Sequence, residues 1–299
     1  MFWSGVTIII STSFYFVYFQ SLIIVMVFTL FLLLLSFSVQ AEIFQWFDAE
    51  GNAYFSDKPH LGAKTLQVNA GHTFYQLKKI YDGDTILLTN GQKVRFLGVN
   101  TPEVEGRNKA EQAGGEEAKQ WLLSVLKNKK IRLERDVEKQ DKYGRLLAHI
   151  FTEDNVHINL QLLKRGLASI NIYPPNLKYT DVFLQAEQQA EQHQLGIWGD
   201  IEYAPRQAED VKTGRFKGWQ RVQGKVKTVR HSRKNSYLNL TDNFALKIDQ
   251  RAVKLFPELD SYIGKPIEVR GWISKHKKRY SMTLRHPSAM KILNGLVVH

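Results

Sequence analysis

The sequence predicts a mainly β protein with added helices, an α+β fold built on a five-stranded barrel of the OB type. Two observations favour it. Between residues 73 and 200, three strand-like segments are followed by a helical segment, two more strand-like segments and further helices, which is the order of an OB-type barrel with helical additions. A similar order of strands recurs between residues 214 and 299, so we expect a second, OB-like barrel there.

The first predicted barrel begins with a hairpin. "FYQLKKIY" (74–81) and "TILLT" (85–89) are strand-like segments on either side of the turn "DGD". Asn-Gly at 90–91 is a strong signal for a two-residue hairpin turn, so "QKVRFLGV" (92–99) is predicted to return beside its neighbour. Apolar residues at helical spacing in "EEAKQWLLSVLK" (116–127) predict a helix. The remaining elements are the strands "KIRLERDVE" and "RLLAHIFT" and the helices "INLQLLKRG" and "VFLQAEQQAEQHQLGIWG".

The second predicted barrel, 214–299, follows a polar segment, 201–213, that we interpret as a linker. Its strands are expected at "RVQGKVKTVR", "SYLNLT", "FALKID", "PIEVRGWIS" and "YSMTLR", with a helical stretch between the third and the fourth. Five aromatic residues are interleaved with basic segments, and we expect three of them to fill the core and the others to be available for stacking on bases. They are Trp219, Tyr237, Phe244, Trp272 and Tyr280.

Residues 1–41 carry no charged side chain, and their apolar run ends in small and polar residues. Val39 and Ala41 fit the pattern before a signal-peptidase site, so we predict export to the periplasm or the medium. The length of the segment leaves an uncleaved inner-membrane anchor as the alternative, and Met26 could also be the start. The segment "EIFQWFDAEGNAYFSDKPHLGA" that follows predicts a small β-hairpin module within 42–72. It resembles a short module of unknown function found in exported bacterial proteins.

The composition limits the chemistry available. The chain has no cysteine, so disulfides and thiolate metal sites are excluded, and any metal must be held by oxygen or histidine ligands. The formal net charge is +12, and residues 201–299 hold 21 Lys or Arg against eight Asp or Glu. A segment so basic is typical of proteins that bind a polyanion, most often nucleic acid, although such charge can also serve only as a solvated surface.

Acidic and basic residues are predicted to meet at one end of the first barrel. Asp82 and Asp84 flank the start of the hairpin, the Asn-Gly turn brings Arg95 back beside Asp84, and Glu103 follows in the next loop. A second arginine, Arg145, opens a later strand. Carboxylate and carbonyl oxygens suit a hard cation such as Ca²⁺, and arginines bind a phosphodiester and the charge that develops during its hydrolysis.

Six motifs in this part of the chain occur together and in a fixed order. They are "DGDT" (82–85), "RFLGVNTPE" (95–103), "GGEEA" (114–118), "DKYGR" (141–145), "LLKRGLA" (162–168) and "GIW" (196–198). Together they resemble the staphylococcal nuclease, or thermonuclease, family over residues of about 73–200. The resemblance implies an OB-type barrel and a Ca²⁺-dependent nuclease that hydrolyses DNA and RNA and leaves 3′-phosphates. We predict DNA or RNA as the substrate and no obligate protein partner.

The resemblance also implies roles for individual residues. Asp84 corresponds to the principal metal-binding aspartate, and Thr101 to the residue whose backbone carbonyl binds the metal. Arg95 and Arg145 correspond to the phosphate-binding arginines, and Glu103 to the glutamate that activates or positions the attacking water. The supporting positions are Asp82 behind the metal, Asp141 bracing the turn before Arg145, Lys142 and Tyr143 beside the substrate, and Trp198 in the core.

Asn100 departs from the family pattern, which places an aspartate there as the second charged metal ligand. Its amide oxygen can still coordinate, but one negative charge is lost, and Ca²⁺ affinity depends on the number of charged ligands. We therefore expect weaker metal binding or a preference for another divalent ion. Two alternative functions follow from the same residues. One is a non-catalytic nucleic-acid-binding protein on a nuclease fold, and the other is an envelope-binding module whose basic barrel holds an anionic polymer.

Overall fold

The chain was analysed as a computed structural model, and it divides into two compact units between Gly71 and His72. The predicted signal or anchor segment, 1–41, lies outside the described residues. Within the part that is described, no helix is long and apolar enough to cross a membrane. The structure describes residues 43–48, 51–66, 73–106, 111–213 and 219–293.

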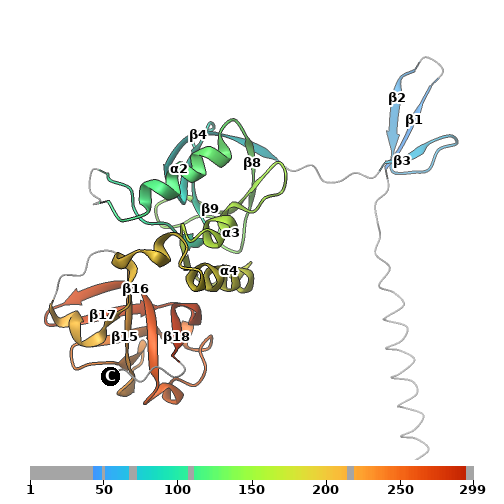
Figure 1. The fold of residues 1–299 in the computed structure, drawn as a ribbon. Helices are drawn as coiled ribbons and strands as arrows, with labels where there is room; N and C mark the ends of the chain where they lie inside the picture. The colour runs from blue at the N-terminus through green and yellow to red at the C-terminus, as the bar shows by residue number, and fades with distance from the viewer. Residues whose placement is uncertain (1–42, 49–50, 67–72, 107–110, 214–218, 294–299) are drawn as a thin grey trace, which may run out of the picture. The chain divides into compact units, whose positions relative to one another are not determined.

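The described part of the first unit is a three-stranded antiparallel sheet in the order β2–β1–β3 (Figure 1). β1 (Ile43–Phe47) and β2 (Ala53–Ser56) form the hairpin that the alternating aromatic pattern predicted. β3 (Lys64–Leu66) pairs with the other edge of β1 and was not predicted, because three residues are too few to show an alternation. The rings of Trp46 and His60 stack with centroids 4.4 Å apart.

The second unit begins with a closed five-stranded barrel in the order β4–β5–β6–β9–β8, which confirms the predicted OB-type barrel. Its neighbouring strands are antiparallel except β6 and β9, which run parallel with Arg95 opposite Leu147. The apolar residues that alternate along these strands fill the barrel, so its core is dry. The strands are β4 (Phe74–Asp82), β5 (Thr85–Leu88), β6 (Lys93–Phe96), β8 (Lys130–Glu134) and β9 (Leu146–Thr152).

Three helices and a short strand pair complete the first barrel. The apolar face of α2 is buried as its spacing predicted, with Ala118 and Leu122 fully covered. Asn100 on β7 lies opposite Ser169 on β10, although 69 residues separate them in the sequence. The elements are α2 (Gly115–Leu126), α3 (Ile158–Lys164), α4 (Thr180–Gln192), β7 (Gly98–Asn100) and β10 (Ser169–Asn171).

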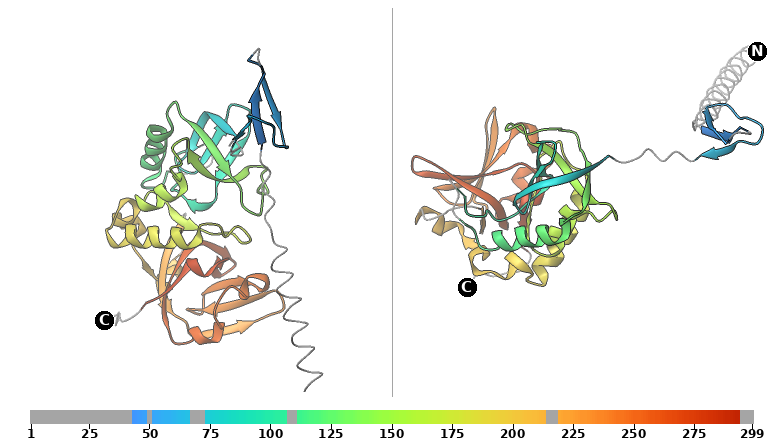
Figure 2. Two further views of the ribbon diagram at one scale, coloured as in Figure 1. Left: turned by 90° about the vertical axis from the view of Figure 1, so that its right-hand side faces the viewer. Right: turned by 90° about the horizontal axis from the view of Figure 1, so that it is seen from above.

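The C-terminal part is an eight-stranded sheet that follows the path β11–β12–β16–β17–β15–β14–β13, with β18 added beside β16. Figure 2 shows this part of the chain, mostly orange to red, from two further directions. Only residues 226–227 separate β12 from β13, so the two together form one bent strand. Because β12 and β13 lie far apart on the path, this bent strand curves the sheet back on itself. The order repeats that of the first barrel, and the parallel pair β15–β17 takes the place of β6–β9. The predicted OB-like architecture is therefore present.

The five predicted strands are present with similar bounds, the first of them divided into β12 and β13, whereas β11 and β18 were not predicted. The short α5 (Gln250–Val253) lies between the third and fourth of these strands, where a helical stretch was expected. The strands are β11 (Arg206–Gln207), β12 (Trp219–Lys225), β13 (Thr228–His231), β14 (Asn235–Asn239), β15 (Phe244–Asp249), β16 (Pro266–His276), β17 (Arg279–Leu284) and β18 (Met290–Ile292).

The segment that we interpreted as a polar linker, 201–213, is folded. It forms two 3-10 helices on either side of β11, and three of its side chains are buried: Tyr203, Ala208 and Val211. Its polar composition concealed these few apolar residues, which are too widely spaced to show a periodicity. Tyr203 packs with Trp198 and Trp219, so the segment contributes to a core shared by the first barrel and the C-terminal sheet.

A buried ion network joins α4 to the C-terminal sheet. α4 lies beside this sheet in Figure 1. The Arg270 guanidinium contacts Glu187 at 2.9 Å and Glu191 at 2.7 Å. Arg221 contacts Glu268 at 2.9 Å, and both guanidinium groups lie over the ring of Trp198. Trp198 is buried, as predicted, and these cations cover it.

Candidate active site

The first hairpin of the barrel brings Asp84 and Arg95 into contact, as the turn chemistry predicted. Thr85 lies opposite Arg95 across β5 and β6, and the Arg95 guanidinium forms an ion pair with the Asp84 carboxylate. A glycine is required at position 83, because a Cβ there would lie 2.6 Å from Cγ2 of Thr101. The chain can therefore place Asp84 close to Thr101 only with Gly83 before it.

Asp84 is held rigidly by hydrogen bonds. One carboxylate oxygen accepts from the backbone N–H of Thr101 at 2.9 Å and the other from the Thr85 hydroxyl at 3.0 Å. The backbone N–H of Asp84 donates to Asp82 at 3.2 Å. Burial and the neighbouring Asp84 carboxylate raise the pKa of Asp82 to about 7, against the lowering effect of Arg95. Asp82 thus contacts Asp84 through the backbone, and its supporting role for a metal stays a prediction.

Asn100 uses both ends of its amide within the same cluster. Its Oδ1 accepts from the Arg95 guanidinium at 3.1 Å, and its Nδ2 donates to the backbone carbonyl of Thr101 at 3.2 Å. A carboxylate at this position could accept the first bond but could not donate the second. The amide nitrogen of Asn100 therefore avoids the repulsion that a carboxylate at position 100 would have with the Thr101 carbonyl if no cation lay between them.

The oxygen atoms in this cluster suit a hard cation. The Asp84 carboxylate and the Asn100 amide oxygen both contact the Arg95 guanidinium, the Thr101 carbonyl accepts from the Asn100 amide nitrogen, and Oγ1 of Thr101 is buried without a hydrogen-bond partner. Ca²⁺ accepts such a mixture of carboxylate, amide and carbonyl ligands. Among the described residues no group of three or more His, Asp or Glu side chains could hold a metal. A cation here would therefore be held by few charges and several neutral oxygens.

The backbone of Glu103 is fixed against the start of α2. Its N–H donates to the side-chain oxygen of Gln112 at 3.0 Å, and the N–H of Gln112 donates back to the Glu103 carbonyl at 2.9 Å. A Cβ at Gly115 would lie 2.5 Å from that carbonyl, so the approach requires a glycine. Residues 107–110, which follow Glu103 in this loop, lie outside the described residues. The Gln112 contact was not predicted, because no pattern in the sequence indicates it.

Arg145 is presented by the turn that Asp141 organises. Oδ1 of Asp141 accepts from the backbone N–H groups of Tyr143 and Arg145, at 2.9 and 3.0 Å, and Oδ2 contacts the Arg145 guanidinium at 2.7 Å. Arg145 precedes Leu147 by two residues, and Leu147 is paired with Arg95. Arg145 itself lies just before β9, which begins at Leu146, so the two arginines come from neighbouring strands of the barrel.

Lys142 and Tyr143 lie at the exposed tip of this turn. The Tyr143 side chain is 72% exposed, with the Lys142 ammonium 4.9 Å and the Arg145 guanidinium 5.5 Å from its ring centroid. The two groups of predicted residues are thus placed on one barrel, the oxygen cluster at the first hairpin and the arginine turn before β9.

Comparison with known proteins settles the family. Residues 93–200 match the model for staphylococcal nuclease homologues. The chain is 37% identical over 169 residues to a thermonuclease from Staphylococcus intermedius, which covers 56% of this chain and 94% of the relative. The chain belongs to the staphylococcal nuclease family. It is also 41% identical over 161 residues to endonuclease YncB of Bacillus subtilis, covering 52% of this chain and 76% of that nuclease.

As a member of this family, the protein is a nuclease that hydrolyses phosphodiester bonds, and its substrate is nucleic acid. Residues 30–113 also match the model of a domain of unknown function, which includes the N-terminal hairpin and reaches into the barrel. The match to the nuclease family confirms the resemblance that the six motifs indicated.

Proposed function

We propose that this nuclease is a metal-dependent endonuclease that cleaves DNA or RNA and leaves 3′-phosphates. The observation that carries the proposal is the contact of Arg95 with both Asp84 and Asn100, beside the Thr101 carbonyl. The Arg95 guanidinium, a group that can bind phosphate, and a set of hard oxygen ligands thus lie together. This is the arrangement that a charged phosphodiester and a divalent ion require together.

The proposed roles follow from the family resemblance and from the contacts among Asp84, Arg95, Asn100 and Thr101. When bound, one divalent ion, Ca²⁺ in the first instance, would rest on Asp84, Asn100 and Thr101 and would offset the charge of the phosphodiester. Arg95 and Arg145 bind the non-bridging phosphate oxygens, where charge accumulates in the transition state. Glu103 accepts a proton of the attacking water, whose oxygen forms a bond to phosphorus. The bond from phosphorus to the 5′-oxygen breaks, and this oxygen takes a proton from solvent and leaves as a hydroxyl group.

We also propose the organisation and the location of the protein. An export segment, 1–41, precedes a hairpin module, 42–72, a catalytic domain, 73–200, and a basic OB-like domain, 214–299. The support for export is the apolar, charge-free N-terminal segment. Pulse-labelling and cell fractionation test this. We expect the labelled protein to become shorter by about 41 residues and to be found outside the cytosolic fraction. An unshortened protein in the membrane fraction would favour the anchor.

A cleavage assay tests the proposed activity. Labelled single-stranded DNA and RNA are incubated with the protein in Ca²⁺, in Mn²⁺ or in chelator, and the product ends are examined with a phosphatase that removes 3′-phosphates. Metal-dependent cleavage with phosphatase-sensitive ends is expected. Tight retention of the nucleic acid without any cleavage would favour the non-catalytic alternative. Lack of both, together with binding to an anionic envelope polymer, would favour the third function.

A further inference from the structure

The outer face of the C-terminal sheet carries a row of side chains that ends at a pocket shared with β10, the strand that pairs with Asn100. We propose that this row, called the track below, binds single-stranded nucleic acid and extends the site along the strand. The inference rests on the proposed function, because the strand held by the track is the one that the oxygen cluster would cleave. The track consists of Arg230, Tyr237, Lys247, Thr283 and Trp272.

Strand register places four of these residues in line. Arg230 lies opposite Tyr237, Tyr237 opposite Lys247, and Lys247 opposite Thr283. Directly paired residues share one face of a sheet, and their inward-facing neighbours fill the core, so all four face outward. With neighbouring strands roughly 4.8 Å apart, a row that crosses five strands is about 19 Å long.

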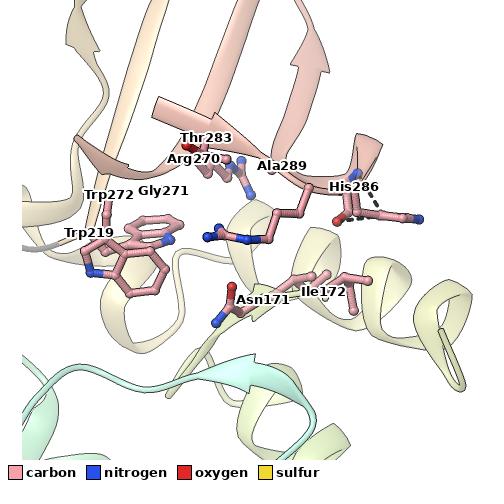
Figure 3. Close-up of a pocket in the computed structure, with 12 residues that line it drawn as sticks. Asn171, Ile172, Trp219, Arg270, Gly271, Trp272, Thr283, His286 and Ala289 are labelled. Atoms are coloured by element: carbon pink, nitrogen blue, oxygen red, sulfur yellow. Dashed lines mark hydrogen bonds between the residues drawn. The ribbon is translucent and has the colours of Figure 1, made fainter. Parts of the chain in front are cut away.

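Trp272 continues the row onto the fifth strand. β16 pairs with β17 from His276 opposite Arg279 to Ile273 opposite Met282. Trp272 and Thr283 are the next positions on the two strands. Both line one pocket, whose opposite wall is formed by Asn171 and Ile172 (Figure 3). The cavity volume is about 30 Å³, about the space of one water molecule, so the exposed ring of Trp272 rather than the cavity offers room for a base.

The pocket connects the track to the candidate metal site. Asn171 is the last residue of β10, and Ser169 at the start of the same strand lies opposite Asn100. Two residues of extended strand span roughly 7 Å. The pocket at the end of the track is therefore lined by the same short strand, β10, that pairs with Asn100.

The chemistry of the track fits unpaired bases joined by phosphates. Of the five aromatic residues in the C-terminal sheet, Trp219, Phe244 and Tyr280 are buried, as the sequence analysis expected for three of them. The two that remain accessible, Tyr237 and Trp272, are both on the track, and Trp272 is 40% exposed. Aromatic faces between cations are the usual platform for single strands, because every base can stack and every phosphate needs a counter-charge.

Two cation–aromatic pairs mark the ends of this surface. The Arg230 guanidinium lies 4.8 Å from the ring centroid of Tyr237 at the far end. Beside the pocket, Arg285 lies 4.5 Å from the ring centroid of Tyr173, a residue of the first barrel that is 39% exposed. An arginine plane above an aromatic ring can itself stack on a base. A base-free polyanion would gain nothing from these rings, so single-stranded nucleic acid is the occupant that the surface favours.

Binding measured without cleavage tests the track. Dissociation constants of labelled 12-nucleotide and 4-nucleotide single strands are determined by anisotropy with the full chain in chelator. Trp272→Ala and Tyr237→Ala should each weaken binding of the 12-mer by about 5- to 100-fold, the range for loss of one stacked base. Arg230→Gln with Lys247→Gln should flatten the log–log salt dependence by about 1.4, because two phosphate contacts are lost.

Matched controls and competitors make the result decisive. Lys127→Gln with Lys254→Gln removes the same charge from exposed positions outside the track and should leave the salt slope unchanged. Polyphosphate should compete poorly against the 12-mer. Any one of three results would overturn the track. The first is a decrease in salt slope in the control pair equal to that in the track pair, and the second is equal affinity of the wild type for the 12-mer and the 4-mer. The third is competition by polyphosphate as strong as that by an unlabelled 12-mer. Cleavage of the 12-mer by the wild type in Ca²⁺ tests the proposed function separately: if it fails while the 12-mer still binds through the track, only the proposed function is overturned.

Discussion

Asn100→Asp is the substitution that tests the oxygen cluster most directly. The Asn100 amide nitrogen donates to the Thr101 carbonyl at 3.2 Å, and its Oδ1 accepts from Arg95 at 3.1 Å. An aspartate keeps the bond from Arg95 but places a carboxylate oxygen against the Thr101 carbonyl, and both of these groups can only accept. Losing a partner for a half-buried group costs about 1–3 kcal/mol, so we expect the metal-free variant to melt at a lower temperature than the wild type.

A bound divalent ion reverses the sign of this effect. Two unit charges 4 Å apart attract by ~4 kcal/mol at an effective dielectric constant of 20, and desolvation of the new carboxylate offsets much of that gain. A net gain of about 1.4 kcal/mol already corresponds to a tenfold change in affinity. We expect the Ca²⁺ concentration for half-maximal cleavage to fall tenfold or more. Added Ca²⁺ should also raise the melting temperature of the variant by more than it raises that of the wild type.

Calorimetric titration with Ca²⁺ and cleavage of single-stranded DNA across Ca²⁺ concentrations measure the effect. Asn100→Ala is the matched control, because it removes the amide oxygen without adding charge and should weaken Ca²⁺ binding. If folded Asn100→Asp needed as much Ca²⁺ as the wild type, or more, residue 100 would lie outside the ligand set. The reasoning from the Thr101 contact would then be wrong.

Three further predictions concern the mechanism and the fold. Glu103→Gln should reduce turnover by about 10²-fold or more with the fold intact, the cost of removing a positioned proton acceptor; steady-state kinetics and circular dichroism check it. Arg270→Met should lower the free energy of unfolding by about 3–5 kcal/mol, because it leaves Glu187 buried beside an apolar group, and urea unfolding measures this loss. Burial lowers the pKa of His149 to about 4 and of His157 to about 3, below their ordinary value of 6.5. The unfolded chain therefore binds more protons below pH 6.5, and the free energy of unfolding should fall by about 2 kcal/mol per histidine between pH 7 and pH 5.

Each of these predictions has its own control. Glu105→Gln, two residues further on and exposed, should leave turnover unchanged, and wild-type turnover in Glu103→Gln would remove that carboxylate from the mechanism. Adding Glu187→Gln to Arg270→Met should recover part of the lost stability, and no recovery would mean that the unpaired charge is not the cause. His149→Phe should reduce the pH dependence by about half, whereas an unchanged pH profile would show that this histidine is protonated in the folded protein.

Local turn chemistry explains why part of the site could be predicted. The Asn-Gly turn fixes the register of the first hairpin, and register alone brings Asp84 beside Arg95. The pairing of β7 with β10 could not be predicted, because Asn100 and Ser169 meet only after α2, two strands and α3 have packed. The use of the Asn100 amide as a donor to Thr101 was also hidden, since residue type shows what a side chain can bond and not what lies beside it.

The ion network shows why the two barrels should be studied together. One carboxylate oxygen of Glu187 accepts from the backbone N–H of Ile170 on β10 at 2.7 Å, and the other contacts Arg270 of the C-terminal sheet at 2.9 Å. β10 in turn pairs with β7, which ends at Asn100. The same carboxylate thus fixes both the C-terminal sheet and the strand beside the candidate metal site. Deleting the basic barrel would leave Glu187 without its cation and disturb the oxygen cluster, so the contribution of the track to binding can be measured only by substitutions on its surface.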